Sequence, residues 1–580
     1  MRGMPRTLGR SIHAARAGFG RGMALERYAR VVLIGFSGTG KSTVGKHLAE
    51  RLGWALVDTD AEIERRAGTT IPALFEQEGE ARFRERERQA LGEAIGRDAV
   101  VVATGGGAPV ADEAWSDGLL GRPGTLVVTL DAEPDTTMAR LVAQQAAEGD
   151  ATSRPMLAGS DPLARIHSLK AARQTAYDRA DLTLVVDRVA ADVVADEIAR
   201  LPGVAEPDAD PDVRLRAASG TSDILIRPGA VGEVGSVLSR RWPKARRAWV
   251  VSDERVGALH GQPVLSSLRG AGLSAEMRCV PAGEGSKSIG GASALYDWML
   301  GGGIERGDVV VALGGGVVGD LAGFVAATCL RGVGLVQVPT SLLAMVDSSV
   351  GGKTGINHAA GKNLIGAFYQ PPDVVIDPGL LTTLPPRELA CGWGEIVKHA
   401  IIQPSTPDGE RADLARFLER NRARLLALSE PATTYLIRRN VGLKAAVVAA
   451  DEREAGVRAF LNFGHTLGHA IEASSYALLH GEAVGLGMRA AARLGVLAGS
   501  CAEADAGRVW SLADAYGLPS TTDLDEERVL GLLGSDKKRA AGRQRWVLPV
   551  RGDGVAIRDD VAAADVRTAL RSVSANGAGS

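Results

Sequence analysis

Three short motifs in the second half of this 580-residue chain hold side chains that suit a catalytic metal ion. Glu395 stands in Gly-Glu-Ile-Val-Lys, His465 in Gly-His-Thr-Leu-Gly-His, and His480 opens His-Gly-Glu. One carboxylate and two imidazoles can hold Zn²⁺ and leave positions open for a substrate. Scattered structural histidines are the ordinary alternative, and the close spacing of these motifs disfavours it.

A lysine next to the first of these motifs indicates the charge of the substrate. Lys398 follows Glu395 by three residues, so on a helix the two side chains share a face. A cation beside a metal ligand favours an anionic substrate bound at the metal.

A second kind of chemistry is encoded near the N-terminus. Residues 35–43 read Gly-Phe-Ser-Gly-Thr-Gly-Lys-Ser-Thr, follow a short apolar run and precede a helical pattern. Such a loop wraps phosphates with backbone amides, its lysine reaches the β/γ-phosphates, and its serine binds Mg²⁺. The predicted nucleotide-binding residues are Gly38, Thr39, Gly40, Lys41, Ser42 and Thr43.

A second glycine-rich turn, residues 314–320, follows the apolar run 309–313. A turn of this kind lets a pyrophosphate approach the N-terminus of the next helix. Taken alone, it could equally be a packing turn.

The composition is that of an ordinary globular protein, with 45% apolar and 23% charged residues and a net charge of −2. This balance predicts neither nucleic-acid nor membrane partners, and no apolar run reaches the roughly 18 residues of a membrane span. The four cysteines form no Cys-x-x-Cys pair, which favours a reduced, cytoplasmic location.

The elements that must position these motifs alternate along the chain. Strands are expected at 31–34, 99–103, 125–130 and 182–186, and a second series starts at Ile224 with 247–252, 308–313 and 334–338. Helical stretches between them predict an α/β fold with parallel sheets, and a mostly helical region from about residue 386.

We therefore expect a phosphate-loop domain at 28–200, a Pro/Asp-rich linker at 201–222, a Rossmann-like domain at 223–385 and a helical metal-binding domain at 386–570. Residues 571–580 are expected to be a disordered tail. Residues 1–27 are expected to be a disordered extension, although their arginines could also mimic a transit peptide, or translation could begin at Met23.

Residues 28–200 resemble shikimate kinase. Besides the phosphate loop, the resemblance is carried by Asp-Thr-Asp at 58–60, Phe-Arg-x2-Glu at 83–87, Gly-Gly-Gly at 105–107, Arg-Pro at 154–155 and Arg-x3-Tyr at 173–177. The segment 144–161 is long for the family's lid, and residues 174–176 lack the proline that the family usually has.

The resemblance implies phosphorylation of shikimate by MgATP. Asp60 would hold the ring hydroxyls and help to activate one of them, Asp58 would act with Ser42 on the magnesium, and the backbone near Gly106 would touch the ring. Arg84 and Arg173 would clamp the substrate carboxylate as bidentate guanidinium groups, and Arg154 would meet the ATP phosphates.

Residues 223–570 resemble 3-dehydroquinate synthase. The resemblance is carried by the glycine-rich turn and the metal motifs together with Gly-Glu-Gly-Ser-Lys at 283–287, Pro-Thr-Ser at 339–341, the segment 346–355, Gly-Lys-Asn at 361–363 and Thr-Thr-Leu-Pro at 382–385. It implies an NAD⁺- and Zn²⁺-dependent cyclisation of a seven-carbon keto-acid phosphate, 3-deoxy-D-arabino-heptulosonate 7-phosphate, with Co²⁺ as the alternative metal. Oxidation of a hydroxyl, loss of phosphate, reduction, ring opening and an aldol closure follow in turn, and NAD⁺ is regenerated.

The family's site residues carry over to positions of this chain. The phosphate end of the substrate is assigned to Lys353, Asn363, Lys398 and one of Lys537 and Lys538. Other polar substrate groups are assigned to Asp347, Lys444, Arg458 and Asn462, with His469 moving protons, Glu454 organising the site and Arg331 reaching across a dimer interface. The metal ligands are Glu395, His465 and His480. The cofactor site is assigned to Asp253, Glu284, Lys287, Gly315, Gly316, Asp320, Thr340, Ser341, Lys353, Lys362 and Thr383.

The sequence therefore predicts a bifunctional shikimate-pathway enzyme, a homodimer through its synthase half. Two alternatives stay open at this point. One is a metal- and NAD-dependent polyol dehydrogenase on the fold of the second half, which Lys353, Lys398 and Lys538 disfavour. The other makes one half a non-catalytic binding module, which the intact Lys41, Asp60, Arg84 and Glu395 disfavour.

Overall fold

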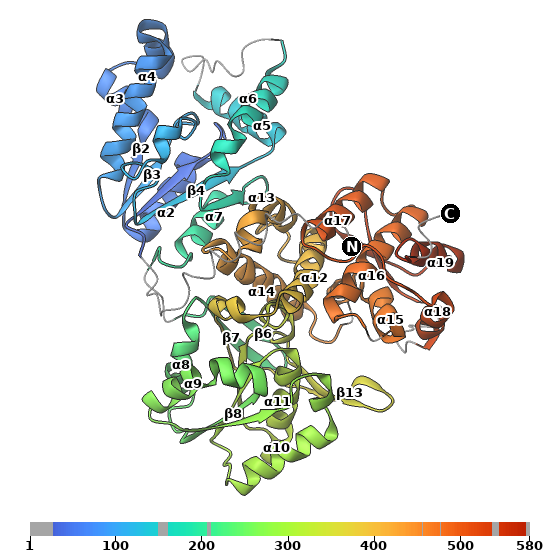
Figure 1. The fold of residues 1–580 in the computed structure, drawn as a ribbon. Coiled ribbons are helices and arrows are strands. Elements are labelled where there is room, and N and C mark those ends of the chain that lie inside the picture. The colour runs from blue at the N-terminus through green and yellow to red at the C-terminus, as the bar shows by residue number, and fades with distance from the viewer. Residues whose placement is uncertain are drawn as a thin grey trace, which may run out of the picture. The chain divides into compact units, whose positions relative to one another are not determined.

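A computed structural model describes residues 27–148, 160–205, 210–454, 456–475, 477–535 and 544–575. These residues form two compact units (Figure 1). The N-terminal unit combines residues 27–205 with residues 410–435, and the C-terminal unit comprises residues 210–409 and 436–575. The predicted domain bounds stay predictions. The two units are defined by compactness only, and they place the distant segment 410–435 with the N-terminal unit.

The N-terminal unit is built on a five-stranded parallel sheet with the order β2-β3-β1-β4-β5. Its strands are β1 (Arg30–Ile34), β2 (Ala55–Asp58), β3 (Val100–Ala103), β4 (Thr125–Asp131) and β5 (Leu182–Val185). Four of them were predicted, because they are continuous buried apolar runs, as parallel strands require. The edge strand β2 was not among the expected apolar runs, since it is short and partly exposed, with Leu56 40% exposed.

The helices of this unit connect the parallel strands, so each strand returns to the same direction. They are α2 (Lys41–Leu52), α3 (Thr59–Ala67), α4 (Ile71–Ile95), α5 (Pro134–Glu148), α6 (Pro162–Tyr177) and α7 (Ala191–Ala199). The strands are parallel, so their carboxyl ends lie on the same side of the sheet. The phosphate loop after β1, Asp58 at the end of β2 and the glycines after β3 therefore meet there.

The edge strand β5 of this sheet is covered by α13 (Leu414–Leu426). The buried Asn421 accepts from the backbone N–H of Thr183 at 3.0 Å and donates to its carbonyl at 2.8 Å, so its amide takes the place of a neighbouring strand. Arg416 and Arg420 pair with Asp131 at the end of β4. An uncovered edge strand is a site for aggregation, and α13 removes that exposure from β5.

Replacing Asn421 with alanine leaves the backbone groups of Thr183 buried without partners. We expect this change to lower the free energy of unfolding of the N-terminal unit by about 1–3 kcal/mol, measured by chemical denaturation. Ala423→Gln, on the exposed face of the same helix, is the matched control. Equal stability of the two variants would show that Asn421 does not hold the edge of the sheet.

The C-terminal unit contains a seven-stranded sheet with the order β6-β7-β14-β11-β10-β8-β9. Its strands are β6 (Val213–Ala217), β7 (Gly220–Ile226), β8 (Arg247–Asp253), β9 (Ser274–Val280), β10 (Val309–Gly314), β11 (Gly334–Pro339) and β14 (Asp373–Ile376). They are parallel apart from the β6–β7 hairpin. Helices α8 (Val234–Arg241), α9 (Glu254–Gly270), α10 (Ile289–Gly301) and α11 (Gly316–Thr328) pack into two apolar cores, one on each face of the sheet.

Two sequence expectations are corrected by this unit. The predicted linker 201–222 contains β6 and the start of β7, because Leu215 points inward between the exposed Arg214 and Arg216, a strand alternation that the preceding Pro/Asp cluster obscured. Residues 571–575 of the predicted tail 571–580 belong to the fold, and residues 576–580 lie outside the described residues. Val573 is buried and Thr522 forms a bridge with Ser574.

Beyond the sheet the C-terminal unit is mainly helical. The helices are α12 (Pro386–Ile402), α14 (Ala432–Ala450), α15 (His465–Ser475), α16 (His480–Leu497), α17 (Glu503–Ala515), α18 (Glu526–Ser535) and α19 (Ala563–Arg571). Two hairpins accompany them, β12 (Lys353–His358) with β13 (Gly361–Phe368), and β15 (Trp546–Pro549) with β16 (Val555–Arg558).

Close packing brings α12 against the start of α16. A Cβ atom on Gly481 would lie 1.9 Å from the carbonyl oxygen of Cys391, and one on Gly394 would lie 2.6 Å from the carbonyl oxygen of Gly481. Only glycine permits this approach, which sets the residues following Gly394 and preceding Gly481 beside each other.

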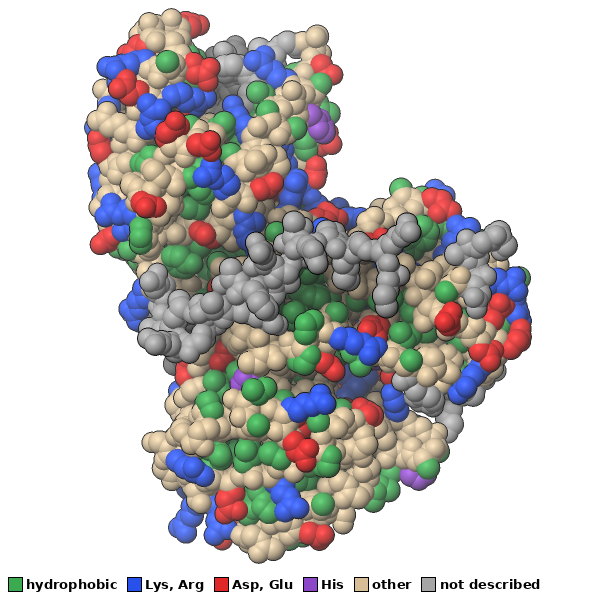
Figure 2. Space-filling model, in the orientation of Figure 1, with side chains coloured by type: hydrophobic (Ala, Val, Ile, Leu, Met, Phe, Trp, Pro, Cys, Tyr) green, Lys and Arg blue, Asp and Glu red, His purple; other side chains and the backbone are tan. Residues whose placement is uncertain are grey.

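Positive and negative side chains are mixed on the surface in view. On the face shown in Figure 2, Lys and Arg side chains are interspersed with Asp and Glu. Within the described ranges, no helix combines the length and the apolar character needed to cross a membrane.

Candidate active sites

The phosphate loop has the backbone geometry that its glycines imply. Gly35 adopts φ +136°, and a Cβ atom there would lie 2.3 Å from the carbonyl oxygen of Leu130, so no other residue fits. Gly40 adopts a left-handed φ of +90° just before α2 begins at Lys41. The Nζ of Lys41 donates to the carbonyls of Gly35 at 3.0 Å and Phe36 at 2.9 Å, and burial lowers the pKa of this amine to about 8.

The two predicted magnesium residues lie together. The hydroxyl of Ser42 donates to Oδ2 of Asp58 at 2.5 Å, while Oδ1 of Asp58 caps α3 by accepting from the backbone N–H groups of Asp60 and Ala61. Hydroxyl and carboxylate oxygens are the ligands that Mg²⁺ prefers, so this pair fits the predicted ion.

Asp60 has the environment of a proton acceptor. Its Oδ1 is buried and has no hydrogen-bond partner among the described residues. Burial raises the pKa of Asp60 to about 6, with the charges of Glu87 and Asp58 adding to the effect. A Cβ atom on Gly105 would lie 2.6 Å from Asp60 Oδ1, so glycine is required at the position that faces this carboxylate.

Two arginines converge on the glycines that follow β3. Arg173 Nη1 donates to the carbonyl of Gly106 at 3.3 Å, and the hydroxyl of Tyr177 donates to the same carbonyl at 2.7 Å. Arg84 lies so close to Gly107 that a Cβ atom there would meet its guanidinium at 2.2 Å. The structure therefore brings together Asp60, Arg84, Gly106 and Arg173, whereas Arg154 lies outside the described residues.

Glu87 belongs to this pocket, although the sequence gave it no role. It is buried and accepts from Arg84 Nη1 at 2.8 Å, which holds that guanidinium toward Gly107. The spacing of three residues between Arg84 and Glu87 on one helix was the signal that could have identified it.

The metal motifs meet in the C-terminal unit as predicted. Glu395 is fully buried on α12, and its Oε1 lies 3.3 Å from Nε2 of His465 and 3.5 Å from Nε2 of His480. That oxygen has no hydrogen-bond partner among the described residues, and Oε2 is paired with Lys398. An unpaired buried carboxylate oxygen facing two imidazole nitrogens fits a bound divalent cation.

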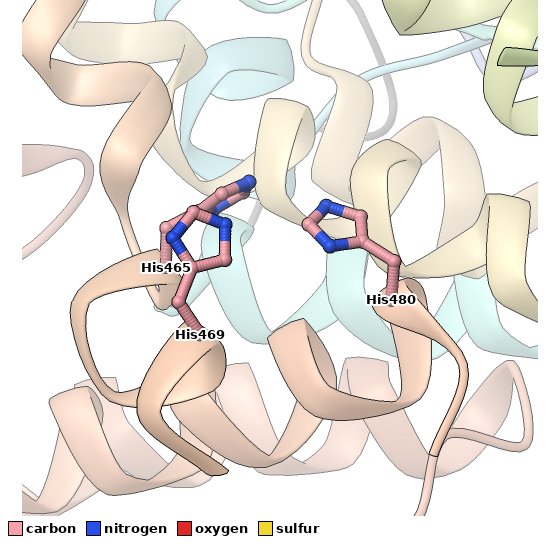
Figure 3. A group of neighbouring side chains, drawn as sticks. All are labelled: His465, His469 and His480. Carbon is pink, nitrogen blue, oxygen red and sulfur yellow. The ribbon is translucent and has the colours of Figure 1, made fainter. Parts of the chain in front are cut away.

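A third imidazole lies at the same place. The ring of His469 is 5.1 Å from that of His465 and 5.6 Å from that of His480, and the three labelled rings surround one region in Figure 3. Their nitrogens fall within 4.8 Å of one another. The geometry therefore places His469 close enough for either ligation or proton transfer, and its assignment to proton transfer stays a prediction.

Neighbouring charges shift the pKa values of the residues in this cluster. Burial lowers the pKa of His480, but Glu395 and Glu472 outweigh it and raise that pKa to about 9. Burial raises the pKa of Glu395, yet Lys398 and His465 hold it well below its usual range. Each carboxylate of the cluster thus favours a positive charge beside it.

Beside this cluster lies a cavity of about 310 Å³, large enough for a small polar substrate. Its lining includes four predicted residues, Glu454, Asn462, His465 and His469. It also includes Arg545, which the sequence did not single out. Lys537 and Lys538 lie outside the described residues.

Two further predicted residues, Lys444 and Asp347, form an ion pair in this unit. Lys444 Nζ donates to Oδ1 of Asp347 at 2.6 Å, and His399 Nε2 lies 3.7 Å from the same oxygen. Burial raises the pKa of Asp347, but Lys444 and Lys398 outweigh it and lower that pKa. Asp347 and Glu395 thus share one network of buried lysines.

The β12–β13 hairpin brings the remaining predicted residues to the helices. Lys353 Nζ pairs with Glu454 at 2.9 Å, and Asn462 donates to the other oxygen of Glu454 at 2.6 Å. Arg458 donates to the carbonyl of Gly351 at 3.4 Å. Glu454 and Asn363 adopt left-handed φ values of +65° and +57°, a strained backbone that is typical of functional sites.

The predicted cofactor residues gather at the carboxyl ends of the sheet strands. Gly315 precedes α11, and Lys287 Nζ pairs with Asp320 at 2.5 Å and with Asn363. Asp253 caps α9 by accepting from two backbone N–H groups.

Two further contacts belong to this region. Glu284 accepts from Asn357 at 2.8 Å, and Thr383 lies 2.8 Å from Nε2 of His260. Neither Asn357 nor His260 was identified from the sequence. Arg331 is exposed with a left-handed φ of +67°, and its predicted role across a dimer stays a prediction.

These sites indicate two enzyme units in one chain. The first is a phosphate-loop kinase, and the second is a Rossmann-like unit with a candidate metal site. Residues 37–201 match the family "Shikimate kinase", residues 277–391 match "3-dehydroquinate synthase N-terminal" and residues 392–539 match "3-dehydroquinate synthase C-terminal". The 3-dehydroquinate synthase of Caulobacter vibrioides is 45% identical over 361 residues, covering 60% of this chain and 94% of that protein.

A second relative and a solved structure agree with these matches. The 3-dehydroquinate synthase of Desulforamulus reducens is 44% identical over 351 residues, 60% of this chain and 96% of that protein. The structure of the 2-epi-5-epi-valiolone synthase ValA from Streptomyces hygroscopicus, with NAD⁺ and Zn²⁺ bound, aligns with a TM-score of 0.55 and 28% identity over 61% of this chain and 96% of that one. The chain belongs to the 3-dehydroquinate synthase family and carries a shikimate kinase domain before the synthase, so it is a kinase and a lyase of the shikimate pathway.

The raised pKa of Asp60 and the lowered pKa of Lys41 predict a bell-shaped pH dependence of kinase kcat/KM. Asp60 accepts a proton only as a carboxylate, so the rate should rise with pH through about 6. Lys41 binds phosphate only as a cation, so the rate should fall above about 8. Initial rates of ADP formation between pH 5 and 9 measure both limbs. A rate that stays nearly constant from pH 7 down to pH 5, as an aspartate with its ordinary pKa of about 4 would give, would show that burial does not tune Asp60.

Proposed function

We propose that the N-terminal unit transfers the γ-phosphoryl group of ATP to shikimate and that the C-terminal unit converts 3-deoxy-D-arabino-heptulosonate 7-phosphate to 3-dehydroquinate with release of phosphate. The observation that carries the second assignment is the unpaired Oε1 of Glu395, which faces two imidazoles next to Lys398. A metal site beside a buried lysine suits a substrate with adjacent hydroxyls and an anionic group.

In the kinase, positioning and charge carry the reaction. Lys41 and the loop amides hold the ATP phosphates, and Ser42 with Asp58 hold Mg²⁺. Arg84 and Arg173 bind the carboxylate of shikimate, which places a ring hydroxyl at Asp60. Asp60 then takes the proton of that hydroxyl, since its raised pKa lets it do so near neutral pH.

In the synthase, Glu395, His465 and His480 are the residues that would hold Zn²⁺ or Co²⁺. When bound, the ion supplies Lewis-acid polarisation of substrate oxygens, and NAD⁺ held near Gly315 and Lys287 supplies a reversible oxidation. The match to a relative solved with NAD⁺ and Zn²⁺ supports this pair of cofactors.

The remaining residues bind the substrate and move protons. Lys353 and Lys398 offer cations for the phosphate and for anionic oxygens, while Lys444 orients Asp347 toward a substrate hydroxyl. His469 lies at the mouth of the metal cluster and borders the cavity, so it can take or give a proton at a bound substrate.

We place the chain in a reducing compartment such as the cytoplasm, as a homodimer through the synthase. Cys279, Cys329, Cys391 and Cys501 are all free thiols, which supports that environment. The two reactions are not consecutive steps, so we expect each site to work with freely diffusing substrate.

Lys41→Ala removes the cation that holds the ATP phosphates. We expect it to abolish ATP-dependent phosphorylation of shikimate and to leave phosphate release from the seven-carbon substrate unchanged. Both activities are assayed on the same purified chain. Lys46→Ala, on an exposed turn of the same helix, is the matched control, and loss of both activities in Lys41→Ala would contradict two separate sites.

Glu395→Gln removes the charge of the central metal ligand and leaves Lys398 buried without its partner. We expect loss of bound metal, measured by elemental analysis after dialysis, loss of 3-dehydroquinate formation, and a fall of about 3–5 kcal/mol in the stability of the C-terminal unit. Adding Lys398→Met should restore stability but not the metal. A Glu395→Gln chain that keeps stoichiometric metal would remove this residue from the site.

A further inference from the structure

Glu472 lies at the metal cluster, although no role was predicted for it. It follows His469 by three residues and His465 by seven on α15, so the three side chains share one face of the helix. Its Oε2 lies 3.1 Å from Nδ1 of His480, and its Oε1 lies 2.7 Å from Nζ of Lys362. One half-buried carboxylate therefore joins a metal ligand to the β12–β13 hairpin.

The contact with His480 fixes which nitrogen of that ring faces the metal. A carboxylate only accepts hydrogen bonds, so Nδ1 must carry a proton to pair with Glu472. Nε2 is then the nitrogen that faces Oε1 of Glu395, 3.5 Å away, and the one available to bind the metal. Orientation of a metal-bound imidazole by a carboxylate at its other nitrogen raises the basicity of the ligand.

The second imidazole is held by the same scheme with a weaker acceptor. His465 Nδ1 lies 3.2 Å from the carbonyl oxygen of Phe463, and its Nε2 faces the same Oε1 of Glu395. His480 differs in that its acceptor carries a full charge. Removal of Glu472 should therefore weaken one metal ligand and leave the other in place.

The contact with Lys362 has a different consequence. Lys362 is on β13, and the hairpin is bound at a second point by the pair between Lys353 and Glu454. The hairpin also carries Asn363, which contacts Lys287 in the predicted cofactor site. Through Glu472, the orientation of a metal ligand and the position of this hairpin depend on the same side chain.

We propose that Glu472 is the positioning residue for His480, setting its tautomer and orientation for the metal, and that Lys362 holds Glu472 in the conformation that does so. This inference rests on the proposed metal site. The structural alternative is that Glu472 serves only as an ion-pair anchor for the hairpin. In that case its removal and the removal of Lys362 would have the same consequences.

Metal binding to the full chain separates these two roles. The probe is Co²⁺ added to chelator-treated protein, followed by its visible absorption bands and by competition with a chelating indicator. Glu472→Ala should weaken Co²⁺ binding about 10- to 100-fold and alter the absorption bands. Glu472→Gln, which keeps an oxygen to accept from Nδ1, should recover part of that affinity. Lys362→Met should weaken Co²⁺ binding far less than Glu472→Ala.

The unfolding transition of the C-terminal unit reports that each variant is folded there, since kinase activity reports only on the N-terminal unit. Unchanged Co²⁺ affinity and absorption in Glu472→Ala would overturn the inference while the metal site stands. Equal losses in Glu472→Ala and Lys362→Met would assign Glu472 to the hairpin alone and overturn it as well. Absence of Co²⁺ binding in the unmodified chain would overturn the proposed metal site and this inference together.

Discussion

Glu395 is the side chain on which the arrangement of the C-terminal unit depends. A fully buried carboxylate is costly unless other charges compensate it, and here Lys398 satisfies one oxygen while the other faces two histidines. The surrounding elements serve this arrangement. Gly394 and Gly481 let α12 and α16 approach each other, and the buried lysines at 398 and 444 balance the acids at 395 and 347. The oxygen of Glu395 that Lys398 does not pair with is the one that faces the two histidines and fits a divalent cation.

In the kinase pocket, burial shifts the pKa values of Asp60 and Lys41 toward neutrality. Oδ1 of Asp60 has no hydrogen-bond partner among the described residues, and the pKa of Asp60 rises into the range of a useful base. Lys41 is buried against loop carbonyls, and its pKa falls. The raised pKa of Asp60 suits proton acceptance near pH 7, and Lys41 is still cationic at that pH and can bind phosphate. Each unit therefore contains its own tuned charges, and no residue is assigned to both reactions.

Much of this could be predicted from the sequence, because the functional motifs follow strands or share helix faces. The phosphate loop, the residues Asp58 and Asp60, and the metal set of Glu395, His465 and His480 are brought together as their spacing implied. Sequence reasoning failed where a role depends on long-range contact. Strand β6 was taken for linker because Pro and Asp precede it, and the pairing of α13 with β5 joins residues 238 positions apart. Glu472 could have been found from its helical spacing, but its partner Lys362 is 110 residues away.

The central claim is that the C-terminal unit performs a redox-neutral, metal-dependent elimination of phosphate. Its most direct test is simultaneous measurement of phosphate release and of absorbance at 340 nm, with purified chain, NAD⁺ and the seven-carbon substrate over many turnovers. The account predicts phosphate in amounts far above the enzyme concentration, no net NADH, and loss of the reaction after removal of metal by a chelator with recovery on adding Zn²⁺ or Co²⁺. NADH accumulating in step with substrate consumption, as a polyol dehydrogenase would produce, would contradict it.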